Sequence, residues 1–157
     1  RGLSNRFYEY IQLLDESDYG VLSFQMSGNK GPGTLEIEKK WTIKEIFDIL
    51  EINMDSNIAK SGQYLGGVLI LQKNKHLMEY MDKYMNYVLN HSDLCTDDYN
   101  HQQKFTGFIE NRHEQSISSV LRKKMGSVVI DGDESWVPPF GKGESMKYPF
   151  WATRNRN

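Results

Sequence analysis

The sequence contains almost no cysteine and no long apolar run. Its 157 residues include a single cysteine, Cys95, which cannot form a disulfide within the chain. A reduced, intracellular setting is therefore favoured over a secreted one, and we expect a cytoplasmic protein. No apolar run approaches the roughly 20 residues that cross a bilayer, so we expect no integral membrane segment.

An excess of positive charge is also missing. The chain has 19 Lys and Arg residues against 21 Asp and Glu residues, which gives a formal net charge of −2. Nucleic-acid-binding domains usually carry a basic excess on one face, so we expect no nucleic-acid partner. No internal repeat, low-complexity tract or linker divides the chain, and its length suits one domain with a single core. Residues 1–157 are therefore interpreted as one domain.

Aromatic residues, by contrast, are abundant. They make up 12% of the chain and include nine tyrosines and three tryptophans. Such side chains stack on sugars and nucleotides, but they are also ordinary residues of cores and interfaces. Both interpretations stay open.

Hydrophobic spacing predicts a mixed α/β protein in the order helix, strand, helix, strand, long helix, helix, strand, tail. We expect helices at residues 5–15, 42–50, 74–90 and 114–124, and strands at 21–24, 68–71 and 127–130. The continuous apolar run at 68–71 is expected to be a central strand. Residues 27–33 are expected to form a glycine-rich loop, and residues 137–157 an irregular tail.

Two details of these helices follow from local patterns. Thr42 and Glu45 have the spacing of a capping box, in which each side chain bonds the other residue's backbone N–H. The long helix carries an apolar stripe that should face the core. Its members are Leu77, Tyr80, Met81, Tyr84, Met85, Val88 and Leu89.

The most polar helix start in the chain lies within residues 108–124. Glu114, Gln115 and Ser116 come at the beginning of a helix whose apolar face includes Ile117 and Leu121. The N–H groups of a first helical turn are unpaired and the helix dipole is positive there. Taken alone, this pattern is typical of a capped surface helix. It is also typical of an active site held by a packed helix.

Three other groups of residues can be considered for chemistry. Gly66 and Gly67 precede a strand and allow a close backbone approach. Asp131 and Asp133 follow a strand in the Asp-x-Asp pattern that can hold a divalent cation. A loop metal site is conceivable, since residues 91–108 are rich in polar ligands. Its candidate ligands are Asp97, Asp98 and His101. No Gly-x-Ser-x-Gly elbow occurs, so a serine triad has no support.

Four stretches of the chain carry a family resemblance. They are residues 40–47, which include Lys-Trp-Thr and Ile-Phe, then residues 61–67, 108–116 and 149–154. Together they resemble the C-terminal half of a family of GT-A-type glycosyltransferases and glycosyltransferase-like proteins, found in bacterial polysaccharide loci and in some large viruses. The family's His-Asp-Gln-Ser motif corresponds here to His113-Glu114-Gln115-Ser116, with glutamate in place of aspartate.

The resemblance implies a GT-A-like (Rossmann-like) mixed sheet flanked by helices. It implies that the N-terminal nucleotide-binding strands and the acidic metal motif precede Arg1, so that the chain is the C-terminal portion of the domain. The implied activity is transfer of a sugar from a nucleotide-sugar donor to a hydroxyl acceptor such as a glycan, in polysaccharide or glycan synthesis. A divalent cation (Mn or Mg) is implied with ligands outside this chain, so no metal role is assigned to Asp131 or Asp133.

The same resemblance suggests the residues of the catalytic centre. Glu114 is the expected catalytic residue, as a base on the acceptor hydroxyl or a group that grips hydroxyls of the donor sugar. Arg112 would face the charge of the diphosphate, and His113 and Gln115 would hydrogen-bond sugar or phosphate.

Further expected substrate-binding residues lie outside this motif. Gly66 and Gly67 would approach the donor sugar or the acceptor, and Trp136 or Trp151 would stack on a sugar ring. The alternative function is a non-catalytic, glycosyltransferase-like binding or assembly module, motivated by the expected missing front half and by the substitution at Glu114.

Overall fold

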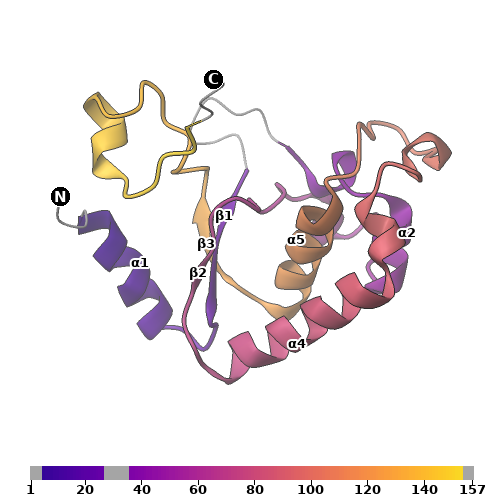
Figure 1. Ribbon diagram of the computed structural model, residues 1–157, viewed down its shortest axis with the longest axis horizontal. Coiled ribbons are helices and arrows are strands. Elements are labelled where there is room, and N and C mark those ends of the chain that lie inside the picture. Colours follow the sequence, from indigo (N-terminus) through magenta and orange to yellow (C-terminus); the bar gives the residue numbers. More distant parts are fainter. Residues whose placement is uncertain (1–4, 27–35, 154–157) are drawn as a thin grey trace.

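The computed structural model places a small mixed sheet between two layers of helix (Figure 1). It describes residues 5–26 and 36–153, so the expected loop at 27–33 and the last residues of the tail, 154–157, lie outside the described residues. The helices are α1 (Asn5–Asp15), α2 (Lys44–Ile49), α3 (Asn57–Lys60), α4 (Lys75–Asn90) and α5 (His113–Met125). The strands are β1 (Val21–Gln25), β2 (Ile70–Leu71) and β3 (Val128–Asp131), and short 3-10 turns are η1 (Glu38–Lys40), η2 (Ser92–Cys95), η3 (Asn100–Gln102) and η4 (Gly143–Lys147).

The sheet has the strand order β2-β1-β3. β1 runs parallel to β3, with Leu22 opposite Val128, and antiparallel to β2, with Val21 opposite Leu71. The expectation of a mixed α/β sheet flanked by helices is therefore confirmed at this level. The expectation of a central strand at residues 68–71 is wrong, because only Ile70 and Leu71 pair and they form an edge of this sheet. Leu71 is 45% exposed, as suits an edge.

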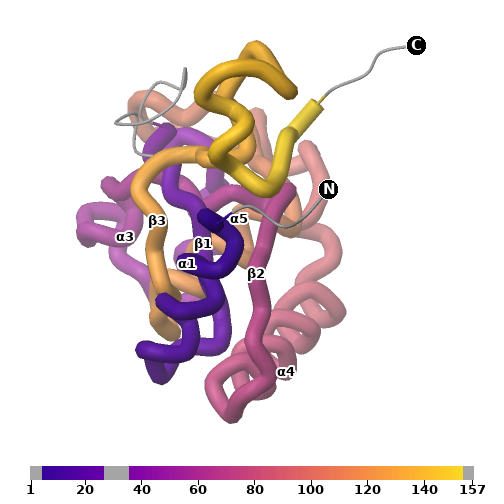
Figure 2. The backbone as a smooth tube through the Cα atoms, turned by 90° about the vertical axis from the view of Figure 1, so that its left-hand side faces the viewer, coloured from indigo at the N-terminus to yellow at the C-terminus, as the bar shows by residue number. Residues whose placement is uncertain are grey.

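β1 takes the central place because both of its faces are covered. Residues 21–24 are fully buried, and their side chains alternate between two cores. Leu22 and Phe24 pack with Tyr10 on α1, whereas Val21 packs with Ile117 on α5. In Figure 2, α1 lies in front of the strands, with α5 and α4 behind them. The structure thus has three layers around β1.

The helices α1, α4 and α5 lie where the hydrophobic spacing predicts them. Asn74 caps α4, because its Oδ1 accepts a 2.8 Å hydrogen bond from the backbone N–H of Leu77. The predicted stripe of α4 is correct for Leu77 and Tyr80, which are buried, and for Met81, Tyr84 and Val88, which pack against the core, but it is wrong for two residues. Met85 and Leu89 are 47% and 70% exposed, because no other described element covers that side of α4. Among the described residues, no helix is both long and apolar enough to cross a bilayer.

The capping box predicted for α2 is not formed. Thr42 Oγ1 instead donates a 3.0 Å hydrogen bond to Oε1 of Glu38, a fully buried carboxylate. α2 begins later, at Lys44, and the N–H of Lys44 donates to the side chain of Gln103 at 2.8 Å. A buried carboxylate needs several donors, and this need overrides the local capping pattern.

We expect Ile117→Ala to destabilise the protein strongly. Ile117 is fully buried where α5 meets the core, and such truncations cost about 2–5 kcal/mol because a cavity remains. The free energy of unfolding in urea measures the loss. Ile109→Ala is the control, because Ile109 is 55% exposed and its truncation should change that free energy by less than about 0.5 kcal/mol. Equal effects of the two changes would contradict this packing.

Candidate functional site

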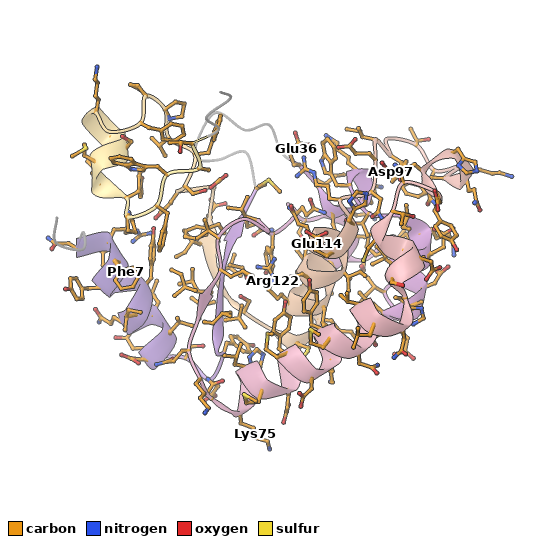
Figure 3. The ribbon with its side chains drawn as sticks, viewed as in Figure 1. Phe7, Glu36, Lys75, Asp97, Glu114 and Arg122 are labelled. Atoms are coloured by element: carbon orange, nitrogen blue, oxygen red, sulfur yellow. The ribbon has the colours of Figure 1, made fainter. Side chains whose placement is uncertain are left out.

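The carboxyl ends of β1 and β3 and the N-terminus of α5 lie at the same end of the molecule (Figure 1). In α/β sheets, ligands bind preferentially beyond the carboxyl ends of parallel strands. Figure 3 shows Glu36, Asp97 and Glu114 at this end and Lys75 at the opposite end. This end is therefore where the expected site residues have to be examined.

Two of the expected residues meet on a third side chain. The Oε1 atom of Gln63 accepts hydrogen bonds from Arg112 Nη1 and from Gln115 Nε2, both at 3.2 Å. Gln115 Nε2 also donates to the carbonyl of Tyr64 at 3.2 Å. Gln63 is fully buried, so its side chain is a fixed acceptor that holds the side chains of Arg112 and Gln115 in place. We call these three residues, Gln63, Arg112 and Gln115, the glutamine cluster.

The guanidinium of Arg112 lies over an aromatic ring. Its central carbon is 3.7 Å from the ring centroid of Trp41, a distance typical of a strong cation–π contact. The indole N–H of Trp41 donates to Glu36 Oε2 at 2.6 Å, and Arg112 Nη1 also contacts the Met26 sulfur at 3.7 Å. The stacked, hydrogen-bonded Arg112 is therefore held in one orientation.

The paired glycines have different surroundings. A Cβ added at Gly66 would lie 3.0 Å from both Cγ and Oε1 of Gln115, so that side chain would have to shift by a few tenths of an ångström. A Cβ added at Gly67 would meet nothing within 4 Å. Gly66 therefore serves the packing of Gln115, whereas the backbone at Gly67 is open to an approaching molecule.

At the start of α5, neighbouring side chains bond to different parts of the protein. His113 has a φ of 49°, in the left-handed region, and its Nε2 lies 3.0 Å from Asp97 Oδ1. A non-glycine residue held in this region costs free energy, which is a feature seen at functional sites. Ser116 Oγ donates to the carbonyl of Trp41 at 2.6 Å and accepts from the N–H of Arg112 at 3.1 Å. These bonds fix the end of α5 to the segment that carries Trp41.

Glu114 is exposed in the first turn of α5. Its charge adds to the effect of burial in raising the pKa of both Tyr84 on α4 and Cys95 in η2. Glu114 therefore lies toward α4, on a different side of α5 from Gln115. The structure brings Arg112, Gln115 and Gly66 together, and it places the expected base beside this group rather than within it.

Both expected stacking tryptophans lie in the segment that follows β3. The Trp136 ring packs edge-on against Phe140 with centroids 5.3 Å apart, and Trp151 Nε1 donates to the carbonyl of Ser145 at 2.8 Å. This segment is fastened to α1 through Glu134, which accepts two hydrogen bonds from Arg6 and one from Tyr10. The contacts named here hold the two rings within their own segment and not against the glutamine cluster.

The described residues do not fit a divalent cation. In residues 5–26 and 36–153, no three His, Cys, Asp or Glu side chains gather in a way that could hold a metal ion. Asp133 Oδ1 accepts from the N–H and the hydroxyl of Ser135, at 2.9 and 2.6 Å, and so shapes a turn. Asp97 pairs with His113, so the conceivable loop site at Asp97, Asp98 and His101 is not formed.

Sequence reasoning missed Gln63 and the role of Trp41. Gln63 lies inside a stretch that carries the family resemblance, but nothing in its spacing shows that a glutamine there is fully buried. Trp41 was recognised only as part of that resemblance.

No protein-family model, curated protein or solved structure matches this chain. The resemblance to glycosyltransferases therefore stays a prediction from the residues.

We expect Gly66→Ala to displace the side chain of Gln115. The added Cβ would shift Gln115 by a few tenths of an ångström and weaken its hydrogen bonds to Gln63 and Tyr64, and the full loss of two neutral hydrogen bonds costs about 1–2 kcal/mol. Urea unfolding measures the loss, and the side-chain NH₂ resonances of Gln115 report the displacement. Gly67→Ala is the matched control and should leave both unchanged within about 0.5 kcal/mol. Unmoved Gln115 resonances in Gly66→Ala would contradict the assigned packing.

Proposed function

We propose that this protein transfers a sugar from a nucleotide-sugar donor to a hydroxyl acceptor, in polysaccharide or glycan synthesis. The observation that carries the proposal is the convergence of Arg112 and Gln115 on one buried glutamine, Gln63, at the start of α5, with Gly66 packed against Gln115. These residues come from two of the stretches that resemble the glycosyltransferase family, and they share the end of the molecule where α/β proteins bind ligands.

Arg112 supplies positive charge for the donor diphosphate. Guanidinium groups pair well with phosphate oxygens, and stacking on Trp41 orders this one before a ligand arrives. The N-terminus of α5 adds the positive end of a helix dipole beside it. Binding at this place would neutralise the charge that develops on the leaving nucleoside diphosphate.

Gln115 and His113 are suited to accept hydrogen bonds from a ligand. Both amide protons of Gln115 are used, on Gln63 and on the Tyr64 carbonyl, so its Oε1 is the atom that can accept from a sugar hydroxyl. His113 faces the carboxylate of Asp97 with Nε2, which assigns the ring proton to that nitrogen. In the neutral ring, Nδ1 is then an acceptor. Gly67 offers open backbone to the same ligand.

Glu114 acts as the base in the proposed reaction. Its exposed carboxylate, on the α4 side of the helix start, takes the proton of the acceptor hydroxyl. The acceptor oxygen then bonds to the anomeric carbon, and the bond from that carbon to the phosphate oxygen breaks. The electron pair leaves with the nucleoside diphosphate. We place the acceptor on the α4 side, with any stacking by Trp136 or Trp151 at a more distant part of a long glycan.

The family resemblance also implies a divalent cation. The described residues supply no ligand set for it, so its ligands would lie outside them, and no step above passes through a metal.

We expect Glu114→Gln in the whole protein to lower kcat for sugar transfer by at least about a hundredfold, because a general base contributes that much or more. Circular dichroism and the affinity for the nucleotide sugar should not change. Glu110→Gln is the control, since Glu110 is also an exposed acid close to α5. Unchanged turnover in Glu114→Gln would count decisively against Glu114 as the base.

Calorimetry of the unaltered protein with a nucleotide sugar and Mn²⁺ or Mg²⁺ separates the two candidate functions. Binding accompanied by turnover supports the transferase. If neither binding nor turnover occurs, the non-catalytic assembly module is favoured.

A further inference from the structure

The glutamine cluster is the end of a chain of buried polar groups that begins on α5. Lys123 Nζ donates to Glu38 Oε2 at 2.7 Å, and also to the Ser61 hydroxyl and the Gly62 carbonyl, both at 2.8 Å. The side chains of Lys123 and Glu38 are 4% and 0% exposed. Glu38 Oε2 also accepts from the hydroxyl of Ser119 at 2.6 Å, and a carboxylate paired in this way can only accept hydrogen bonds.

The other oxygen of the same carboxylate faces the glutamine cluster. Glu38 Oε1 accepts from Thr42 Oγ1 at 3.0 Å and from Gln63 Nε2 at 3.1 Å. On the opposite side of the Gln63 amide stand two donors, Arg112 and Gln115. Gln63 is therefore placed between a group that only accepts and groups that donate.

Only one orientation of the Gln63 amide satisfies both sides. If the amide were reversed, its oxygen would face the oxygen of Glu38, and its NH₂ group would face the N–H groups of Arg112 and Gln115. Each of these contacts would leave a buried polar group unpaired. The amide oxygen and nitrogen are thus assigned by the chemistry of their neighbours.

We infer that Gln63 is a positioning residue and that the Glu38–Lys123 ion pair sets its orientation. The ion pair turns the NH₂ of Gln63 toward Glu38. The amide oxygen of Gln63 then faces Arg112 and Gln115 and accepts hydrogen bonds from both. That acceptor holds the guanidinium of Arg112 on Trp41 and the amide of Gln115 against Gly66. The benefit to ligand binding rests on the proposed function, whereas the orientation itself does not.

The first test measures the orientation directly, by NMR of the unaltered protein. Gln63 Nε2 lies 3.4 Å from Thr42 Oγ1, so the Gln63 NH₂ protons should show nuclear Overhauser effects to the Thr42 side chain. Their Overhauser effects to the side-chain NH₂ of Gln115 should be weaker, because the amide oxygen of Gln63 faces that group. The opposite pattern would mean that the amide is reversed, and it would overturn the inference whatever the protein binds.

The second test removes the acceptor. In Gln63→Met, the Arg112 and Gln115 side-chain resonances should shift, and UDP-glucose, used as the probe, should bind about tenfold to a hundredfold more weakly. That range corresponds to one lost hydrogen bond to a charged group. Gln103→Met is the matched control: Gln103 also bridges two elements, but it does so at α2, and its loss should leave UDP-glucose affinity and the Arg112 resonances unchanged.

The outcomes separate the two claims. Unshifted Arg112 and Gln115 resonances in Gln63→Met would overturn the positioning role. Shifted resonances, in a protein that binds no nucleotide sugar in its unaltered form, would uphold the positioning role and count against the proposed function. If Gln63→Met does not fold, the Overhauser pattern of the unaltered protein still decides the orientation.

Discussion

Glu38 and Lys123 are withdrawn from water together, with the carboxylate and the ammonium 2.7 Å apart. Every polar atom of the pair has further partners, among them Ser119, Thr42 and Gln63. Such a pair adds little stability relative to apolar packing, but the loss of one member costs about 3–5 kcal/mol, because a buried charge is left alone. Any rearrangement of η1, α5 or the segment 61–63 would have to separate the pair. The fold is thereby restricted to the arrangement that also forms the glutamine cluster.

A second buried cation extends the same constraint to the sheet. Arg122 is fully buried, and it donates to Ser23 Oγ on β1 at 2.8 Å and to the carbonyl of Leu65 at 3.0 Å. Burial lowers its pKa, and burial also raises the pKa of the neighbouring Tyr64 to about 12. Figure 3 shows Arg122 between α5 and the strands. The polar Ser23 in the otherwise apolar run 21–24 is explained, because an apolar residue there would remove the acceptor that Arg122 Nη1 uses.

These buried charges also explain which parts of the structure the sequence could predict. The elements α1, β1, α4, α5 and β3 follow from hydrophobic periodicity, which records burial along one element at a time. Glu38 and Lys123 belong to runs of charged residues that are typical of solvated surfaces, and no spacing rule connects two residues so far apart in the chain. The capping box at Thr42 failed for the same reason, since its hydroxyl is used by Glu38. The partners of these polar side chains are therefore set by hydrogen bonds and ion pairs between residues far apart in the chain, which local patterns do not record.

The candidate site was predictable to a similar extent. The stretch at the start of α5 was recognised, but a helix turns by about 100° per residue, so consecutive residues must face different surroundings. Gln115 accordingly faces Gln63, and Glu114 lies toward α4. In the proposed reaction this division is useful: one side of the helix start holds the donor, and the adjacent side offers a base to the acceptor. Glutamate extends the carboxylate by one methylene group beyond the aspartate of the motif it resembles, and this added reach would suit the proposed base, which lies beside the glutamine cluster rather than within it.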